Sequence, residues 1–260
     1  VDPVFREYER TVVTAFDAYI KPTVDAYLSN LSQALRRKNV GASLQIMQSR
    51  GGLAGAETAR IRPVRLFLSG PAGGVMGALS EGKANNYNDL ITVDIGGTSC
   101  DIALVNGAKP LIRQEGFIDK YMVRVPMVDV SAIGSGGGSI AWLDKAGGLK
   151  VGPHSAGSEP GPACYDRGGS EPTVTDASLV LGLIDPDFFA GGRFNLNIDK
   201  AYNAISENIA KPLSLTVEES ALGIHKVLNA QMAEGIRFVS IKQGFDPRDF
   251  VLMGLGGGGP

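Results

Sequence analysis

Cysteine and histidine are scarce in this sequence, and their scarcity narrows the possible chemistry. There are two residues of each type in 260, and Cys100 and Cys164 form no C-x-x-C pair. A disulfide framework and a cysteine-based zinc site are therefore not expected, and a reducing cytosol is the expected compartment. With only His154 and His225 available, no Ser–His–Asp or Cys–His arrangement for nucleophilic catalysis is recognisable.

Long apolar runs, excess positive charge and tryptophan are also missing. No apolar stretch approaches 18 residues and no secretory signal is recognisable, so a membrane segment is not expected. The formal net charge is −2 and there is one tryptophan. These values argue against a protein that binds nucleic acid by neutralising phosphates or by stacking bases.

Glycine, in contrast, is abundant, with 35 residues in 260 against a usual share of about 7%. There is no collagen period, so the glycines are expected in turns and close backbone contacts. The chain starts at Val1 and stops at Pro260 after a glycine run. We therefore expect a piece of a longer polypeptide.

Hydrophobic periodicity and turn residues predict alternating helices and strands. A long helix is expected over Val4–Lys38, with Tyr8, Val12, Ala15 and Tyr19 on its apolar face and a possible break at Pro22. A second capped helix is predicted from Thr216, with Glu219 as its capping-box partner. Strands are expected over Ala42–Gln48, Val64–Leu68, Leu90–Val93, Asp101–Val105, Leu111–Phe117, Tyr121–Val130, Ile140–Leu143, Leu149–Val151 and Phe250–Met253.

A helix from Pro71 to Ala84 is unusually rich in small residues. Each glycine in a helix interior costs about 1 kcal/mol relative to alanine. Gly73, Gly74 and Gly77 therefore need a compensating reason, and close approach of another segment is the expected one.

The sharpest motif runs from Val93 to Asp101, with the sequence VDIGGTSCD. An apolar strand leads to Asp94, Gly96–Ser99 form a turn, and Asp101 lies at the start of the next strand. Successive N–H groups in such a turn can bind an anion, and glycines allow positive φ and close approach of phosphate oxygens. Thr98 and Ser99 add hydroxyl donors, and Asp94 can reach a magnesium-bound water. An ordinary hairpin with a Gly-Gly turn is the alternative.

Other segments are weaker candidates for a site. Gly134–Ser139 either lines a substrate or phosphate, through Gly136 and Gly137, or is a flexible surface turn. Arg167 is a candidate anion ligand or an exposed loop residue. Asp129 either faces the site or ends a strand, and Asp176 is a candidate substrate contact or a helix cap, with Thr175 as the other possible cap.

The order of these motifs resembles the actin, sugar kinase and heat-shock chaperone superfamily. Its members have a small-residue connecting helix, a D-x-G-G-T phosphate turn and a later glycine-rich adenosine loop. Gly70–Ala78, Asp94–Asp101 and Gly256–Gly259 match these three in order. The resemblance implies an α/β actin-like ATPase (ribonuclease H-like) fold, a mixed sheet flanked by helices, present here as a partial chain.

Longer matches identify a narrower resemblance, to the hydantoinase A and oxoprolinase family. They cover almost the whole chain. They include Met47–Leu53, Pro63–Arg65, Leu68–Val75, Gly136–Ala141, Pro160–Tyr165, Pro172–Ala177 and Asp246–Phe250. Ser131 stands where this family often has histidine, so no role carried by that histidine transfers to this chain.

The resemblance divides the chain into four parts of one hydantoinase/oxoprolinase fragment. Residues 1–85 hold the first helix, strands and connecting helix, and residues 86–151 hold the phosphate turn and hairpins. Residues 152–175 form a Gly/Pro loop, and residues 176–260 form a helical segment that ends in the adenosine-type loop.

The resemblance also implies ATP-dependent opening of a cyclic amide, of hydantoin or 5-oxoproline type, with ATP and Mg²⁺ as cofactors. Gly96, Gly97, Thr98 and Ser99 would hold phosphate, Asp94 and Asp101 would serve metal or water, and Gly256, Gly257, Gly258 and Gly259 would lie near adenosine. A second, B-type subunit is expected as partner. An ATP-dependent ketone carboxylase subunit and a non-catalytic actin-like chaperone or reactivase remain alternatives. By itself this stretch is expected to bind ATP weakly, if at all, and not to hydrolyse it.

Overall fold

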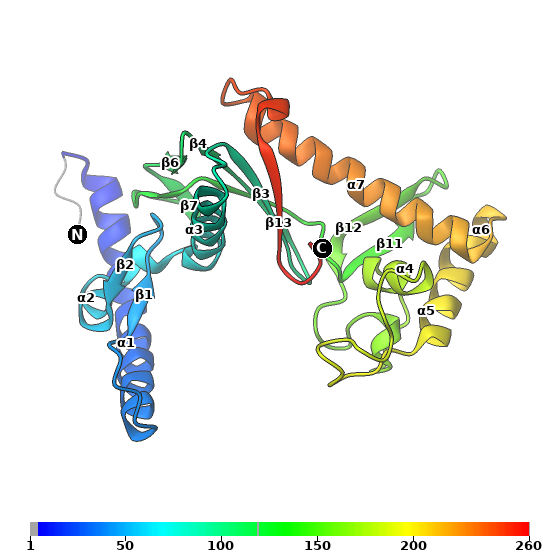
Figure 1. Ribbon diagram of the computed structural model, residues 1–260, viewed down its shortest axis with the longest axis horizontal. Coiled ribbons are helices and arrows are strands. Elements are labelled where there is room, and N and C mark those ends of the chain that lie inside the picture. Colours follow the sequence, from blue (N-terminus) through cyan, green and yellow to red (C-terminus); the bar gives the residue numbers. More distant parts are fainter. Residues whose placement is uncertain (1–4, 119, 260) are drawn as a thin grey trace. The chain divides into compact units, whose positions relative to one another are not determined.

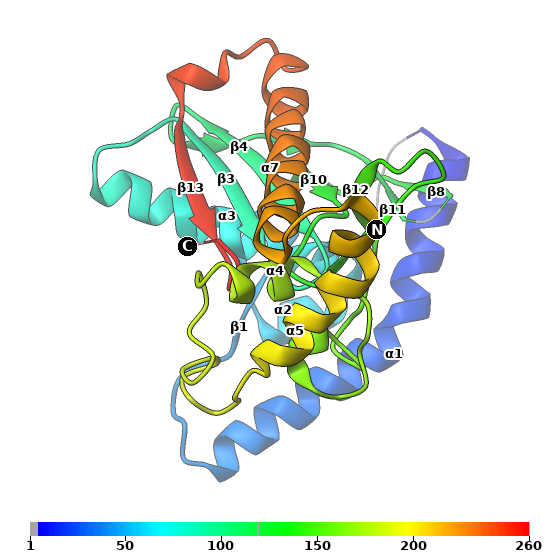
Figure 2. The same cartoon turned by 90° about the vertical axis from the view of Figure 1, so that its right-hand side faces the viewer.

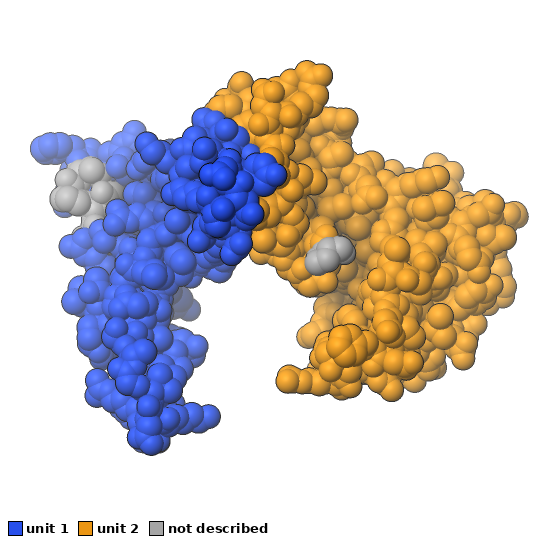
Figure 3. Space-filling view, in the orientation of Figure 1, with its two compact units in different colours: residues 1–90, 103–130 blue, residues 91–102, 131–260 orange. Residues whose placement is uncertain are grey.

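The computed structural model describes residues 5–118 and 120–259, which fall into two compact units (Figures 1 and 3). Unit 1 comprises residues 1–90 and 103–130, and unit 2 comprises residues 91–102 and 131–260. Two ends of predicted elements, Val4 of the long helix and Pro260 of the glycine loop, lie outside the described residues. The fold is mixed α/β, as the sequence predicts.

Unit 1 starts with α1, which spans Glu7–Arg37 and passes Pro22 without ending. Its buried row differs from the predicted one, because Tyr8 and Tyr19 are exposed whereas Val13 and Asp17 are buried. Val13 packs with Val64, Val123, Val125 and Met127 in the core of this unit. This packing, together with the intact helical turns on either side, offsets the cost of the backbone hydrogen bond that is missing at Pro22.

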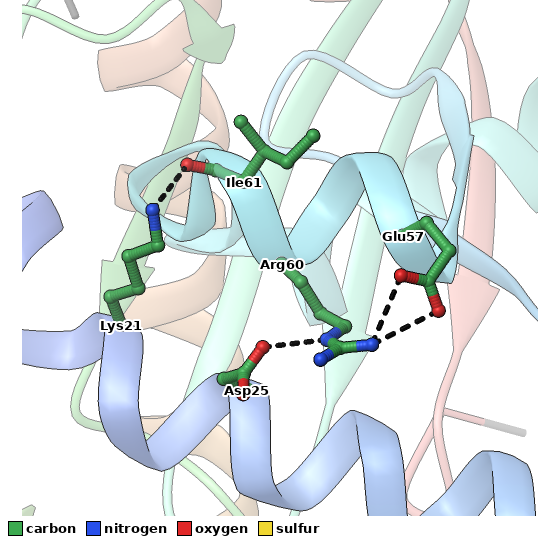
Figure 4. A network of polar contacts seen from close by, with 5 residues as sticks. All are labelled: Lys21, Asp25, Glu57, Arg60 and Ile61. Atoms are coloured by element: carbon green, nitrogen blue, oxygen red, sulfur yellow. Dashed lines mark hydrogen bonds and ion pairs between the residues drawn. The ribbon is translucent and has the colours of Figure 1, made fainter.

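A short hairpin and two helical turns follow α1. Strands β1 (Gln45–Met47) and β2 (Leu53–Gly55) pair antiparallel, and α2 (Ala56–Ile61) follows directly. The predicted strand Val64–Leu68 is wrong, because Pro63–Leu66 form a 3-10 helix whose first residue is the proline. The Arg60 side chain in α2 donates to Asp25 of α1 and to Glu57, as Figure 4 shows.

Helix α3 spans Ser69–Ala84. The close approach expected at its glycines does not occur at Gly73 or Gly77, since a Cβ at Gly73 would make only an ordinary contact and one at Gly77 would meet no described atom within 4 Å. The tight position is Gly82, where a Cβ would lie 2.6 Å from Leu90 Cδ1 and 2.9 Å from the Tyr87 carbonyl.

The largest sheet has the strand order β10-β4-β3-β13, with β5 paired to β4. Its strands are β3 (Leu90–Ile95), β4 (Cys100–Asn106), β5 (Lys109–Pro110), β10 (Val130–Ile133) and β13 (Val251–Leu255). A tight hairpin joins β4 to β5. Its two loop residues are Gly107 and Ala108, both at positive φ as a type I′ turn requires.

The long strands predicted between residues 111 and 130 are wrong in length. The chain there forms two small antiparallel pairs, β6 (Ile112–Arg113) with β9 (Met127–Val128), and β7 (Gly116–Ile118) with β8 (Tyr121–Val123). Pro126 lacks the N–H that a continuous strand would need, so pairing stops between β8 and β9.

Unit 2 contains the hairpin β11 (Ser139–Leu143) and β12 (Leu149–Ser155), packed against helices (Figure 2). The helices are α4 (Val174–Val180), α5 (Ile198–Ile205) with a π-helical continuation over Ser206–Ala210, α6 (Lys211–Leu213) and α7 (Val217–Ile241); Ala163–Tyr165 and Pro247–Asp249 form 3-10 turns. Ile205, Ile209, Ile224 and Leu228 are prominent in its core. The capping box between Thr216 and Glu219 is confirmed.

None of the helices in the described part of the chain combines the length and apolar character that a membrane span requires.

Candidate functional site

The turn over residues 96–99 joins β3 to β4 within unit 2 and presents unpaired backbone N–H groups. The Gly96 N–H donates to the Ser99 carbonyl (2.9 Å), which closes the turn. Within the described residues, the N–H groups of Gly97, Thr98 and Ser99 have no acceptor. Residues 96–98 are exposed, and a Cβ at Gly97 would meet no atom within 4 Å. The turn can therefore donate several hydrogen bonds to an anion placed above it.

One expectation about this turn is wrong. Neither Gly96 nor Gly97 adopts positive φ. At Gly96 an added Cβ would only make ordinary contact with the Ser99 carbonyl, 3.6 Å away. The glycines therefore do not relieve backbone strain here. What they provide is an open surface beside the N–H groups.

The segment Gly136–Gly138 packs directly on the turn and is not a flexible surface loop. The Gly137 N–H donates to the Gly96 carbonyl (2.9 Å), and the Gly138 N–H donates to the Gly97 carbonyl (2.6 Å). A Cβ at Gly136 would lie 2.7 Å from the Gly96 oxygen and 2.8 Å from the Ser99 nitrogen. The two backbones can come this close because Gly136 has no side chain at the contact.

This glycine segment is itself held by hydrogen bonds with Thr175, Ala156 and Ser139, a role that sequence reasoning did not assign to these residues. The N–H and hydroxyl of Thr175 both donate to the Gly137 carbonyl, each at 2.8 Å. The Ala156 N–H donates to the Gly138 carbonyl (2.9 Å), and the Ser139 hydroxyl accepts from the Gly136 N–H (2.9 Å). The start of α4 and the Gly/Pro loop thereby fix the position of the residues 96–99 turn.

The glycine loop after β13 meets the same place from the end of β3. Gly256 has φ +79°, and a Cβ there would collide with the Asp94 carboxylate and lie 2.5 Å from the Ile95 carbonyl. The Gly258 N–H donates to that carbonyl (3.0 Å), and the Gly259 N–H donates to the Gly256 carbonyl (3.2 Å). Three glycine segments that are far apart in sequence therefore converge around Asp94 and the turn.

Two carboxylates lie at this convergence. Burial raises the pKa of Asp101, and the nearby Asp94 charge raises it further. The Cys100 thiol between turn and strand is buried, which raises its pKa to about 11 and keeps it protonated. Across residues 5–118 and 120–259 no group of three or more His, Cys, Asp or Glu side chains is arranged to hold a metal. A cation here would depend on water and ligand oxygens besides a carboxylate, which is the coordination that Mg²⁺ favours.

Asp176, another of the weaker candidates, lies in the interior of unit 2 and not at an open surface. Asp176 is fully buried, and its carboxylate accepts hydrogen bonds from the N–H groups of Ala163, Cys164 and Thr173 and from the Thr173 hydroxyl. It is the capping-box partner of Thr173, so the predicted caps, Thr175 and Asp176 itself, are each off by a few residues.

Arg167 and Asp129 each have another partner. Arg167 is exposed and lies over the Phe194 ring, 4.7 Å from its centroid. Asp129 belongs to unit 1, where it forms an ion pair with Arg113 (3.8 Å). Ser131 lines an open groove of about 980 Å³ along α7, together with Trp142 and Phe238. Neither Arg167 nor Ser131 forms a hydrogen bond with the residues 96–99 turn in the described part of the chain.

Comparisons with known proteins agree on one family. The family model described as hydantoinase/oxoprolinase matches residues 10–260. The chain is 43% identical over 257 residues to the caprolactamase subunit alpha of Pseudomonas jessenii, covering 99% of this chain and 37% of that protein. It is 34% identical over 272 residues to a 5-oxoprolinase of Saccharomyces cerevisiae, covering 100% of this chain and 21% of that protein.

Two solved structures are similar over 99% of the chain. A nucleotide-free acetone carboxylase structure, described as ATP-dependent, superposes with a TM-score of 0.85 at 32% identity, over 36% of its chain. The ATP-dependent caprolactamase from Pseudomonas jessenii superposes with a TM-score of 0.81 at 41% identity, over 37% of its chain. The sequence thus spans little more than a third of the caprolactamase and acetone carboxylase chains and about a fifth of the 5-oxoprolinase. The chain belongs to the hydantoinase/oxoprolinase family.

Proposed function

We propose that the turn over residues 96–99 binds the phosphates of ATP in an actin-like ATPase fold. The observation that carries this proposal is the set of three successive N–H groups, of Gly97, Thr98 and Ser99, without acceptors in the described chain. Unpaired N–H groups on an exposed turn favour an anion. The Thr98 hydroxyl adds a donor, and Gly256–Gly259, packed at the end of β3, would lie near the adenosine.

The two carboxylates have different parts in this proposal. When bound, Mg²⁺ would neutralise part of the phosphate charge. Asp94 would accept a hydrogen bond from a water of the metal's hydration shell, because its carboxylate lies beside Gly256 at the edge of the turn. Asp101, whose pKa is raised by burial and by Asp94, would orient a water.

The reaction that we propose for the complete protein is ATP-dependent opening of a cyclic amide. The lactam oxygen takes the γ-phosphoryl group of ATP, and ADP leaves. One water adds to the activated carbon and the C–N bond breaks, which leaves an acyl phosphate and the free amine. A second water hydrolyses the acyl phosphate to the carboxylic acid and phosphate. An amide is a poor electrophile, so the protein has to supply mainly positioning and charge neutralisation. A rigid turn of N–H donors fits that requirement. The support for a lactam comes from the caprolactamase and 5-oxoprolinase relatives.

A second candidate is ATP-dependent carboxylation of a ketone. The similarity to acetone carboxylase, with a TM-score of 0.85, favours it. Both reactions would use the same phosphate turn, so the turn does not discriminate between them. We also propose a partner subunit, because the caprolactamase relative is named as a subunit.

The test is ATP hydrolysis by the complete protein with its partner subunit, measured with a panel of lactams, hydantoins and small ketones. We expect a lactam or hydantoin to stimulate phosphate release and to yield the ring-opened acid. Asp94→Asn should abolish the stimulated rate, whereas Asp199→Asn, which removes an exposed carboxylate on α5, should not. Stimulation by ketones alone, with bicarbonate consumed, would select the carboxylase. Full activity of Asp94→Asn would refute the assignment of the site.

A further inference from the structure

A small cavity in unit 1 is lined by two arginines and a buried amide. It measures about 50 Å³ and lies among Gln48, Arg50, Arg65, Val125 and Pro126. Gln48 and Arg50 follow β1, Arg65 belongs to the 3-10 helix, and Val125 and Pro126 connect β8 to β9. The cavity belongs entirely to unit 1 and shares no residue with the Gly96–Ser99 turn.

Backbone hydrogen bonds fix the segments around this cavity. Both the N–H and the hydroxyl of Ser49 donate to the Arg65 carbonyl, at 2.7 and 2.6 Å. The Ser49 carbonyl accepts from the Val128 N–H (2.8 Å). Ser49 itself is 1% exposed. The three segments that line the cavity are thus joined through one buried residue, and the cavity has a defined shape before any ligand binds.

The polar groups at the cavity have no partners in the part of the chain that the structure describes. Gln48 is 6% exposed, yet its side-chain amide forms no hydrogen bond there. The same holds for the guanidinium groups of Arg50 and Arg65, and no acidic side chain lines the cavity. The amide atoms of Gln48 keep some accessible surface, since among the described residues only Arg113 Nε is a fully buried side-chain atom without a partner. The amide is therefore available to a ligand. An anion in the cavity would neutralise the two guanidinium charges and accept a hydrogen bond from the Gln48 amide.

We propose that this cavity binds the carboxylate group of a small organic acid. A cavity needs about 10–15 Å³ of this kind to hold one water molecule, so about 50 Å³ accommodates a planar carboxylate. A guanidinium group can donate two parallel N–H hydrogen bonds to a carboxylate, and the Gln48 side-chain amide would donate a further one. Val125 and Pro126 provide an apolar wall beside the bound group. The proposal does not depend on the nucleotide site.

The test is a titration of the 260-residue chain with sodium acetate, followed by NMR of the arginine Nε–H groups at constant ionic strength. Sodium chloride and inorganic phosphate are titrated in parallel. We expect saturable shifts at Arg50 and Arg65 with acetate, and none at Arg62, an exposed arginine that does not line the cavity. Arg65→Gln should weaken acetate binding about tenfold, as expected for loss of a hydrogen bond to a charged group.

Gln48→Leu, which keeps the volume, should also weaken binding, while the matched control Arg62→Gln should leave it unchanged. Gln48→Leu and Arg50→Gln keep the test decisive where Arg65→Gln does not fold. Equal, non-saturating shifts at all arginines, or wild-type affinity in these variants, would overturn the proposal. Tighter binding of phosphate than of acetate at the same arginines would overturn the assignment to a carboxylate.

Discussion

Replacing Gly136 by alanine tests the packing that positions the residues 96–99 turn. The new Cβ would lie 2.7 Å from the Gly96 oxygen, 2.8 Å from the Ser99 nitrogen and 2.8 Å from the Thr98 carbonyl carbon. All three atoms are backbone, so no flexible side chain can move aside. One segment has to shift, and the neighbouring bonds from Gly137 and Gly138 to the turn would lengthen.

Three contributions set the expected loss of folding stability. Overpacking costs about 1–3 kcal/mol, and each weakened hydrogen bond costs about 0.5–1.5 kcal/mol. Restricting the unfolded chain returns about 0.4–1 kcal/mol, because Gly136 is not at positive φ. We therefore expect Gly136→Ala to lower the free energy of unfolding of unit 2 by about 2–4 kcal/mol.

Urea unfolding followed by the fluorescence of Trp142 is a suitable assay, because this single tryptophan lies in β11, directly after the glycine segment. Gly97→Ala is the matched control, since a Cβ there meets nothing within 4 Å. It should leave stability almost unchanged but weaken Mg-ATP binding, because the methyl group would lie on the open face of the turn. A Gly136→Ala variant as stable as the parent would refute the reasoning.

Three further predictions concern charges and caps. Burial raises the pKa of Asp101, so its protonation favours the folded state below its usual value of 3.8, and this contribution is lost as pH rises through the raised pKa. Asp101→Asn should therefore unfold at higher urea than the parent at pH 7, with the difference shrinking toward pH 3. Asp176→Ala removes the acceptor of four buried donors and should cost about 2–4 kcal/mol, whereas Thr216→Ala, in the exposed capping box of α7, should cost about 1 kcal/mol by the same assay. Asp17→Ala should lower the melting temperature followed by circular dichroism, because the buried Val64 N–H loses its acceptor at 3.0 Å. Asp25→Ala, which removes a half-exposed ion-pair partner of Arg60, should change the melting temperature less.

Elements with a strong local signal could be predicted from the sequence. The order strand, Asp94, Gly-Gly turn, strand is confirmed, and so is the capping box at Thr216, because both depend on residues within a few positions of each other. The 3-10 helix over Pro63–Leu66 could not be predicted from its local sequence alone. A short apolar run fits a strand or a helical turn equally well, and the proline at the first position favours the 3-10 helix.

The contacts that build the candidate site depend on distant segments. Nothing near Gly136 in sequence indicates that its backbone lies against Gly96, about 40 positions earlier. Reasoning from neighbouring residues therefore kept a flexible surface turn as an alternative for Gly134–Ser139. The buried row of α1 was missed for a related reason. Asp17 is polar, yet it is buried because its carboxylate accepts from the Val64 N–H. Tyr8 and Tyr19 continue an apolar row but remain exposed.

The central claim is that the turn over residues 96–99 binds nucleotide phosphate. The most direct measurement is a titration of the ¹⁵N-labelled chain with Mg-ATP, followed at the individual backbone amides, which also detects affinities in the millimolar range. The account predicts that the largest saturable shifts occur at Gly97, Thr98 and Ser99, with smaller ones at Gly256–Gly258, and that Thr98→Ala weakens binding. Shifts confined to other parts of the chain, with these amides unchanged at saturation, would contradict it.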